Sequence, residues 1–147
     1  FTVDRFGRRP LMIIGALVMS VAMLLLGTTF YTNSVGMGSL ICMLVYTAGF
    51  AMSWGPVCWV LLAEIFPNSI RSTVMSIAVA GQWVANFLVS WTFPMLDKNQ
   101  YLTDNFNHGV SYWIYGVMGL LAAFFIWKMV PETKGKTLEE MEKYWKR

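Results

Sequence analysis

Residues 10–63 read PLMIIGALVMSVAMLLLGTTFYTNSVGMGSLICMLVYTAGFAMSWGPVCWVLLA, and these 54 positions hold no Asp, Glu, Lys, Arg or His. A helix that crosses the hydrocarbon core of a bilayer needs about 20 apolar residues. The stretch is therefore too long for one crossing and long enough for two, and its polar, glycine-bearing middle at 32–38 is typical of a turn. Two further charge-free runs, 72–96 and 109–127, each predict one more crossing.

The composition of the 147 residues supports this interpretation, since 56% are hydrophobic and only 13% are charged. Soluble domains carry roughly 25% charged residues, so a soluble fold and a disordered chain are both excluded. The net charge of +3 comes without a basic stripe along a folded body, which argues against nucleic acid as a partner. We expect an all-α integral membrane protein with four transmembrane helices and a short cytoplasmic tail helix.

The distribution of Lys and Arg predicts the orientation of the spans. The expected segments are a cytoplasmic loop 1–10, a span 11–31, an external loop 32–38, a broken span 39–64, a cytoplasmic loop 65–71, a span 72–96, an external loop 97–110, a span 111–130 and a cytoplasmic tail 131–147. This arrangement places ten Lys and Arg on one side and Lys98 alone on the other. Because cytoplasmic loops are enriched in Lys and Arg, both ends should face the cytoplasm. The chain starts at Phe1 within a predicted loop and without a signal peptide, so we expect it to be a piece of a longer protein.

The second span carries a Gly55–Pro56 pair near its middle. Proline removes one backbone donor and clashes with the preceding turn, which predicts a kink. Phe50, Trp54 and Trp59 surround the pair, although Trp usually lies at the membrane interfaces. Two interpretations stay open: helices packed around a tolerated proline, or a broken helix that lines a substrate cavity with an aromatic wall.

The third span carries Gln82, Asn86 and Ser90 at a spacing that places them on one helix face. Carboxamides at bilayer depth are costly without partners. They either form hydrogen bonds between helices or face an aqueous pathway, where groups that both donate and accept suit a hydroxyl-rich ligand. The spans hold no Asp, Glu, Lys or Arg at bilayer depth, so they offer no proton relay of their own.

Charged residues gather in the predicted cytoplasmic segments. Residues 4–10 form a tight, charged turn that leads into a span, and Glu64 and Arg71 stand at facing helix ends, where they can pair. In the tail, Thr137 and Glu140 have the spacing of a capping box. Leu138, Met141 and Trp145 follow on one apolar face. This pattern predicts a short helix against the cytoplasmic ends of the bundle, with a frayed tail as the alternative.

Together these segments resemble the sugar porter family of the major facilitator superfamily. Residues 4–9, DRFGRR, are similar to its D-R-x-G-R-R loop motif, and residues 131–135, PETKG, to the signature after its last span. The family signature of the last spans is similar to residues 55–59, GPVCW, with 64–67, EIFP, Arg71 and Gln82–Trp83. The resemblance covers the whole chain and corresponds to spans nine to twelve of the twelve-span fold.

The resemblance implies a transporter whose two six-helix halves rock around a central sugar site. It implies that Trp59 forms the aromatic floor, that Gln82 binds sugar hydroxyls, and that Phe50, Gly55, Trp83 and Asn86 belong to the same wall. It implies that a charge network closes the cytoplasmic side, formed by Asp4, Arg8, Glu64 and Arg71. The implied partners are D-xylose or a similar monosaccharide, a proton whose coupling residues lie outside this chain, the missing N-terminal portion and membrane lipid, with no cofactor or metal. The resemblance also implies that the protein lies in the inner membrane.

Other functional classes fit the residues less well. An intramembrane protease needs paired aspartates, a Ser/His set or a zinc site, yet the sole histidine, His108, falls in a predicted external loop. We therefore expect no enzyme. A drug exporter of the same superfamily and a non-transporting membrane fragment remain alternatives. The tail at 131–135 and Trp59 favour the sugar porter.

Overall fold

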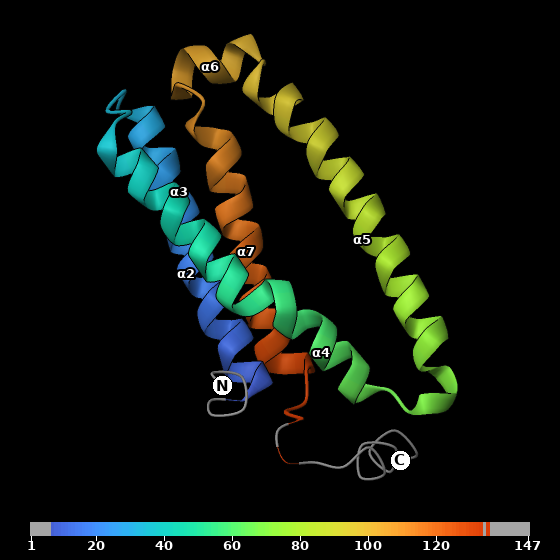
Figure 1. The fold of residues 1–147 in the computed structure, drawn as a ribbon. Coiled ribbons are helices and arrows are strands. Elements are labelled where there is room, and N and C mark those ends of the chain that lie inside the picture. Colours follow the sequence, from blue (N-terminus) through green and yellow to red (C-terminus); the bar gives the residue numbers. More distant parts are fainter. Residues whose placement is uncertain (1–6, 134, 136–147) are drawn as a thin grey trace.

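The computed structural model describes residues 7–133 and 135, and all regular structure in that part is helical (Figure 1). The elements are α2 (Arg8–Tyr31), α3 (Met37–Gly49), the π-helical turn η1 (Phe50–Trp54), α4 (Gly55–Ile65), α5 (Asn68–Asp97), α6 (Gln100–Phe106) and α7 (Gly109–Met129). Four helices are long and apolar enough to cross a membrane: α2, the continuous helix from Met37 to Ile65, α5 and α7. The predicted all-α membrane fold with four spans is confirmed. Asp4 and the predicted tail helix lie outside the described residues.

The helices extend past the charge-free runs from which the spans were predicted. α2 begins at Arg8 and α5 at Asn68, because charged and polar residues at the end of a span still make helical hydrogen bonds. The segment 97–110, predicted as a plain external loop, contains the short helix α6. The side chain of Asn99 starts α6 by accepting hydrogen bonds from the backbone N–H groups of Tyr101 (3.1 Å) and Leu102 (3.4 Å).

The Gly55–Pro56 pair is accommodated by a π-helical turn. Pro56 lacks a backbone N–H, and its ring would clash with the carbonyl four residues earlier in a regular α-helix. In η1 the N–H of Gly55 reaches back five residues to the carbonyl of Phe50, which opens the helix by one residue. The helix therefore continues through the pair, and the irregular turn lies at Phe50–Trp54.

Helices α2 and α7 pack closely because small residues line their contact. A Cβ atom on Gly109 would lie 2.6 Å from the carbonyl oxygen of Gly27, and one on Gly116 would lie 2.8 Å from the Leu24 side chain. Ser20 is buried at the same contact and donates its hydroxyl to the carbonyl of Ala16 (2.6 Å). Close approach of backbones through small residues is the usual packing of membrane helices, where lipid supplies no hydrophobic drive.

The bundle has two ends, which we name by α2. The Arg8 end holds Arg8, Ile65, Asn68 and Met129, and the Tyr31 end holds the opposite helix termini (Figure 1). A core cluster joins α2, α4 and α7 near the Arg8 end; its buried members are Met12, Val57, Leu61, Ile65 and Ile126. The indole of Trp54 also donates to the carbonyl of Met12 (3.0 Å).

Helix α5 stands apart from this packed group. None of its 30 residues is buried, and Figure 1 shows it diverging from α3 and α4, connected through α6 at the Tyr31 end and through residues 66–67 at the Arg8 end. The chain therefore combines a packed three-helix body with one helix whose faces are open.

Candidate functional site

Three of the predicted sugar-site residues lie on the irregular span. Trp59 and Gly55 are half-buried, and Phe50 is exposed. A Cβ atom on Gly55 would lie 3.3 Å from the carbonyl oxygen of Phe50 and 3.6 Å from its ring. Glycine at 55 thus lets the Phe50 ring lie close to the helix backbone.

The other three predicted sugar-site residues lie on α5. Gln82, Trp83 and Asn86 are all exposed. Among residues 7–133 and 135, the side chains of Gln82 and Asn86 make no hydrogen bond, and the Trp83 indole makes no ring contact with Phe50 or Trp59. α4 and α5 diverge from the Arg8 end (Figure 1), so the structure does not bring the two sets together. Their roles in sugar binding stay predictions.

A polar cluster at the Arg8 end joins three segments that are far apart in the sequence. Arg8 Nη2 donates to Glu64 Oε1 at 2.9 Å, and the hydroxyl of Thr133 donates to Glu64 Oε2 at 2.6 Å. The side chains of Arg8 and Glu64 are 17% and 30% exposed, and Thr133 is buried. Because both side chains are partly buried, salt screens this pair less than it screens a fully exposed ion pair. The cluster ties the start of α2 to the end of α4 and to the chain after α7.

Glu132 caps the first turn of α2 from this same segment after α7. Its two carboxylate oxygens accept the backbone N–H groups of Arg8 (3.1 Å) and Arg9 (3.2 Å), which have no partner within the helix. A negative charge at this helix end is also favoured by the helix dipole. Gly7, at φ +91°, makes room for the cap, because a Cβ atom there would lie 3.0 Å from Glu132 Oε2.

Arg71 lies near this cluster without joining its ion pair. Its Nη2 donates to the carbonyl of Phe66 at 3.4 Å, a long hydrogen bond. Arg71 lines a cavity of about 410 Å³ together with Arg8, Glu64 and Thr133. The sequence suggested that Glu64 pairs with Arg71, but within the described part of the chain Glu64 pairs with Arg8.

The role of the segment after α7 was missed by sequence reasoning. Pro131, Glu132 and Thr133 stood out only as part of a family signature, and no role was predicted for the two polar side chains. The available signal was weak: a carboxylate and a hydroxyl directly after the last span, at the end where α2 begins. Nothing in their spacing points to Arg8 or Glu64, which lie more than 60 residues away.

A second polar contact, at the Tyr31 end, was also missed. Asp97 closes α5 and His108 precedes α7, and Asp97 Oδ1 lies 2.9 Å from His108 Nδ1. Rings gather beside this pair. Phe93 on α5 meets Tyr112 and Tyr115 on α7 at centroid distances of 5.5 and 5.9 Å, and Tyr112 stacks on Phe30 of α2 at 4.9 Å.

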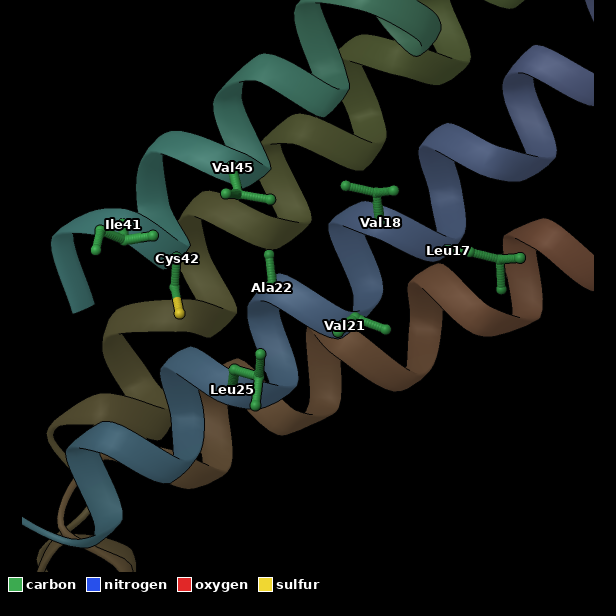
Figure 2. A pocket seen from close by; sticks show the side chains of 8 residues that line it. All are labelled: Leu17, Val18, Val21, Ala22, Leu25, Ile41, Cys42 and Val45. Atoms are coloured by element: carbon green, nitrogen blue, oxygen red, sulfur yellow. The ribbon is translucent and has the colours of Figure 1, made fainter. Parts of the chain in front are cut away.

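The groove between α2 and α3 has no chemistry for a sugar. Figure 2 shows its side chains, which are Leu17, Val18, Val21, Ala22, Leu25, Ile41, Cys42 and Val45. Its volume is about 370 Å³, and apart from the Cys42 thiol it is aliphatic. Sugar hydroxyls buried there would lose hydrogen bonds to water without replacement. In residues 7–133 and 135, no group of three His, Cys, Asp or Glu could hold a metal ion.

Comparison with known proteins places the chain in a sequence context. Residues 1–145 match the family model described as Sugar (and other) transporter. The D-xylose-proton symporter of Escherichia coli strain K12 is 66% identical over 144 residues, which cover 98% of this chain and 29% of that protein. The glucose facilitated diffusion protein of Zymomonas mobilis is 48% identical and also covers 98% of this chain, with 30% of its own length matched.

Solved structures are similar to the fold as well. The inward-open structure of the xylose transporter XylE from E. coli superposes with a TM-score of 0.88 at 64% identity, over 98% of this chain and 31% of that one. XylE bound to 6-bromo-6-deoxy-D-glucose gives a TM-score of 0.87 at 66% identity, over 98% of this chain and 30% of that one. The chain thus spans about 30% of the length of the relatives that it matches, and these relatives are described as transporters.

Proposed function

Because the chain belongs to the Sugar (and other) transporter family, we propose that it forms the last four of twelve spans of a monosaccharide transporter. The proposed substrate is D-xylose or a similar sugar, taken up together with a proton by alternating access. The 66% identity to a D-xylose-proton symporter over nearly the whole chain supports this choice of substrate and coupling ion. The proposed location is the inner membrane with both chain ends in the cytoplasm, which fits ten Lys and Arg on one side against Lys98 on the other.

The observation that carries the proposal is the open polar face of α5. Gln82 and Asn86 lie on a span that can cross a membrane, and both are exposed and make no hydrogen bond to the described residues. Carboxamides left in lipid are costly. They therefore face protein or an aqueous cavity in the whole molecule. An alternating-access cavity meets that need, because water and sugar hydroxyls supply the missing partners.

The aromatic partner in the proposed site is Trp59 on α4. A sugar presents hydroxyls at its rim and C–H groups on its faces, so a site combines carboxamides with an aromatic surface. Gln82 would bind the rim and Trp59 the face, while Phe50, Gly55 and Trp83 would form the neighbouring wall. Helices from the missing part of the protein would close the gap between α4 and α5.

The polar cluster at the Arg8 end would act on conformation. It lies at the proposed cytoplasmic end, far along the helices from Gln82. The Arg8–Glu64 pair and the Glu132 cap hold α2, α4 and the segment after α7 together as one body. Asp4 and Arg71 would complete this network with residues of the other half.

Uptake into proteoliposomes tests the proposal. The full-length protein containing this chain should accumulate D-xylose when the outside is acidic, and collapse of the proton gradient should abolish accumulation. The 147-residue chain by itself should show no uptake above empty vesicles, because alternating access needs two halves. Facilitated equilibration without accumulation would overturn the proton coupling. Absence of any sugar flux in correctly inserted protein would overturn the proposed function.

A further inference from the structure

The turn between α6 and α7 is held from both sides by side chains. Asn107 and His108 both adopt left-handed backbone conformations, at φ 46° and 67°. Asn107 Nδ2 donates to the carbonyl of Tyr31 on α2 at 2.9 Å, and His108 Nδ1 lies 2.9 Å from Asp97 Oδ1 on α5. Such conformations are uncommon outside glycine, so these contacts define the path of the chain into α7.

Asp97 and His108 lie at neighbouring helix ends, where each side chain meets the dipole of the other residue's helix. Asp97 is the last residue of α5, where the helix dipole disfavours a negative charge, and His108 is the N-cap of α7, where a positive charge is disfavoured. Across the contact, however, the carboxylate lies at the start of α7 and the imidazole lies at the end of α5. The dipole of its own helix therefore disfavours each charge, and the dipole of the neighbouring helix favours it.

We propose that Asp97 and His108 form an acid-tightened clamp that fixes this end of α5 to the start of α7. An ionised carboxylate only accepts hydrogen bonds, so Nδ1 of His108 carries the proton in the contact. A neutral imidazole makes this bond, and protonation at Nε2 adds a positive charge beside the carboxylate and converts it to a charge-assisted bond. The clamp is thus weaker at neutral pH and stronger in acid.

Both side chains are open to solvent protons, with the imidazole 42% and the carboxylate 36% exposed. The other titratable groups at this end of the bundle are Lys98 directly after α5, Tyr101 and Asp104 on α6, Tyr112 and Tyr115 on α7, and Tyr31 on α2. Lysine, tyrosine and aspartate ordinarily keep one charge state between pH 5 and 8, whereas histidine ordinarily changes charge in that range.

The clamp acts on the helix that carries Gln82 and Asn86. In the described residues, the side-chain contacts of α5 with α7 lie near the Tyr31 end, where Thr92 bonds Tyr115 at 3.0 Å and Phe93 meets two rings. The rest of α5 diverges from the body (Figure 1). Tightening this attachment restricts the angle at which α5 leaves the body. In the orientation given by the proposed function, on which this placement rests, the clamp faces the external medium.

Hydrogen exchange on the full-length protein in lipid nanodiscs tests the clamp. Backbone exchange in peptides covering residues 97–112 is measured at pH 5.5 and 7.5 and divided by the intrinsic rate at each pH. In the parent, protection should rise about 2- to 5-fold in acid, as expected for a partly exposed ion pair. Asp97→Asn and His108→Gln keep a hydrogen bond and similar size, and each should abolish the rise. Asp104→Asn, which removes one charge from α6, should leave the rise intact.

A parent without the acid-dependent rise would overturn the clamp, as would a rise that persists in His108→Gln or Asp97→Asn or disappears equally in Asp104→Asn. The double variant Asp97→Asn/His108→Gln should match either single variant, because both remove one interaction. Sugar uptake is measured on the same protein preparations after reconstitution into proteoliposomes. Lost uptake with an intact acid-dependent rise would count against the proposed function and leave the clamp standing.

Discussion

The α2–α7 contact and helix α5 show two opposite ways of using a membrane-spanning helix. Between α2 and α7, glycine and serine bring the backbones so close that an added methyl group on Gly109 meets the Gly27 carbonyl at 2.6 Å. On α5 no residue is buried, and an added methyl group on Gly81 meets nothing within 4 Å. The α2–α7 contact is formed entirely by residues of this chain. Helix α5 exposes a polar face, which indicates that its partners are a ligand, water or the rest of the protein.

Glycine-to-alanine substitution should give the largest difference in stability between the α2–α7 contact and α5. Gly109→Ala forces the new Cβ against backbone, which cannot move aside as a side chain can, so we expect a loss of about 1–3 kcal/mol in the free energy of unfolding. Gly81→Ala should be neutral or slightly stabilising, because alanine favours the helix. Thermal unfolding of the full-length protein in detergent measures both. Equal shifts in the two variants would contradict the contrast between packed and open helices.

A charge change in the Arg8-end cluster should affect motion rather than sugar affinity. Glu64→Gln keeps an acceptor for Thr133 but removes the charge that pairs with Arg8. An ion pair that forms in only one conformation shifts the equilibrium toward that conformation. A pair worth about 1 kcal/mol changes the ratio of the two conformations roughly 5-fold. We expect slower D-xylose uptake with an affinity within about 2-fold of the parent.

Uptake kinetics and equilibrium binding on the same preparation check this prediction. Lys98→Gln, a charge change at the opposite end, serves as the control and should leave both unchanged. If Glu64→Gln lost sugar binding and kept its maximal uptake rate, the cluster would have to belong to the binding site.

Asn86 should show the smallest effect on the polar face of α5. It lies one turn beyond Gln82, and both side chains are exposed. We expect Asn86→Ala to weaken D-xylose binding by less than about 5-fold, since a hydrogen bond shared with water contributes only about 1 kcal/mol or less. Equilibrium binding measures this value. A larger loss in Asn86→Ala than in Gln82→Ala would move the proposed contact one turn along the helix.

The four spans could be predicted from the sequence because the bilayer imposes a simple rule on length and charge. Segment 97–110 was different: α6 depends on the Asn99 side chain, a local cap that charge-free runs do not reveal. The family resemblance places Arg8 and Glu64 in one charge network, but their direct pairing does not follow from the sequence, because they are 56 residues apart and meet only when α2 and α4 pack. Residue spacing along one helix cannot report such a contact.

For the candidate sugar site, the sequence predicts a set of residue types whose role stays a prediction, and the structure does not bring these residues together. Gln82 and Asn86 share a face because helical periodicity requires it, and the Gly55–Pro56 pair predicts an irregular turn. Trp59 and Gln82 stay apart in this chain because α4 and α5 diverge (Figure 1). In the proposed function, helices outside this chain close the gap, and the chain spans 29% of the length of the E. coli relative.

Calorimetric titration of D-xylose into the full-length protein tests the central claim most directly, namely that the open polar face of α5 binds the sugar. Removing a partner from a desolvated hydroxyl costs about 1–3 kcal/mol, so Gln82→Ala should weaken binding roughly 5- to 150-fold. Gln100→Ala removes the same side chain from α6 and should bind as the parent does. If Gln82→Ala also binds D-xylose with the affinity of the parent, Gln82 serves helix packing and the claim is wrong.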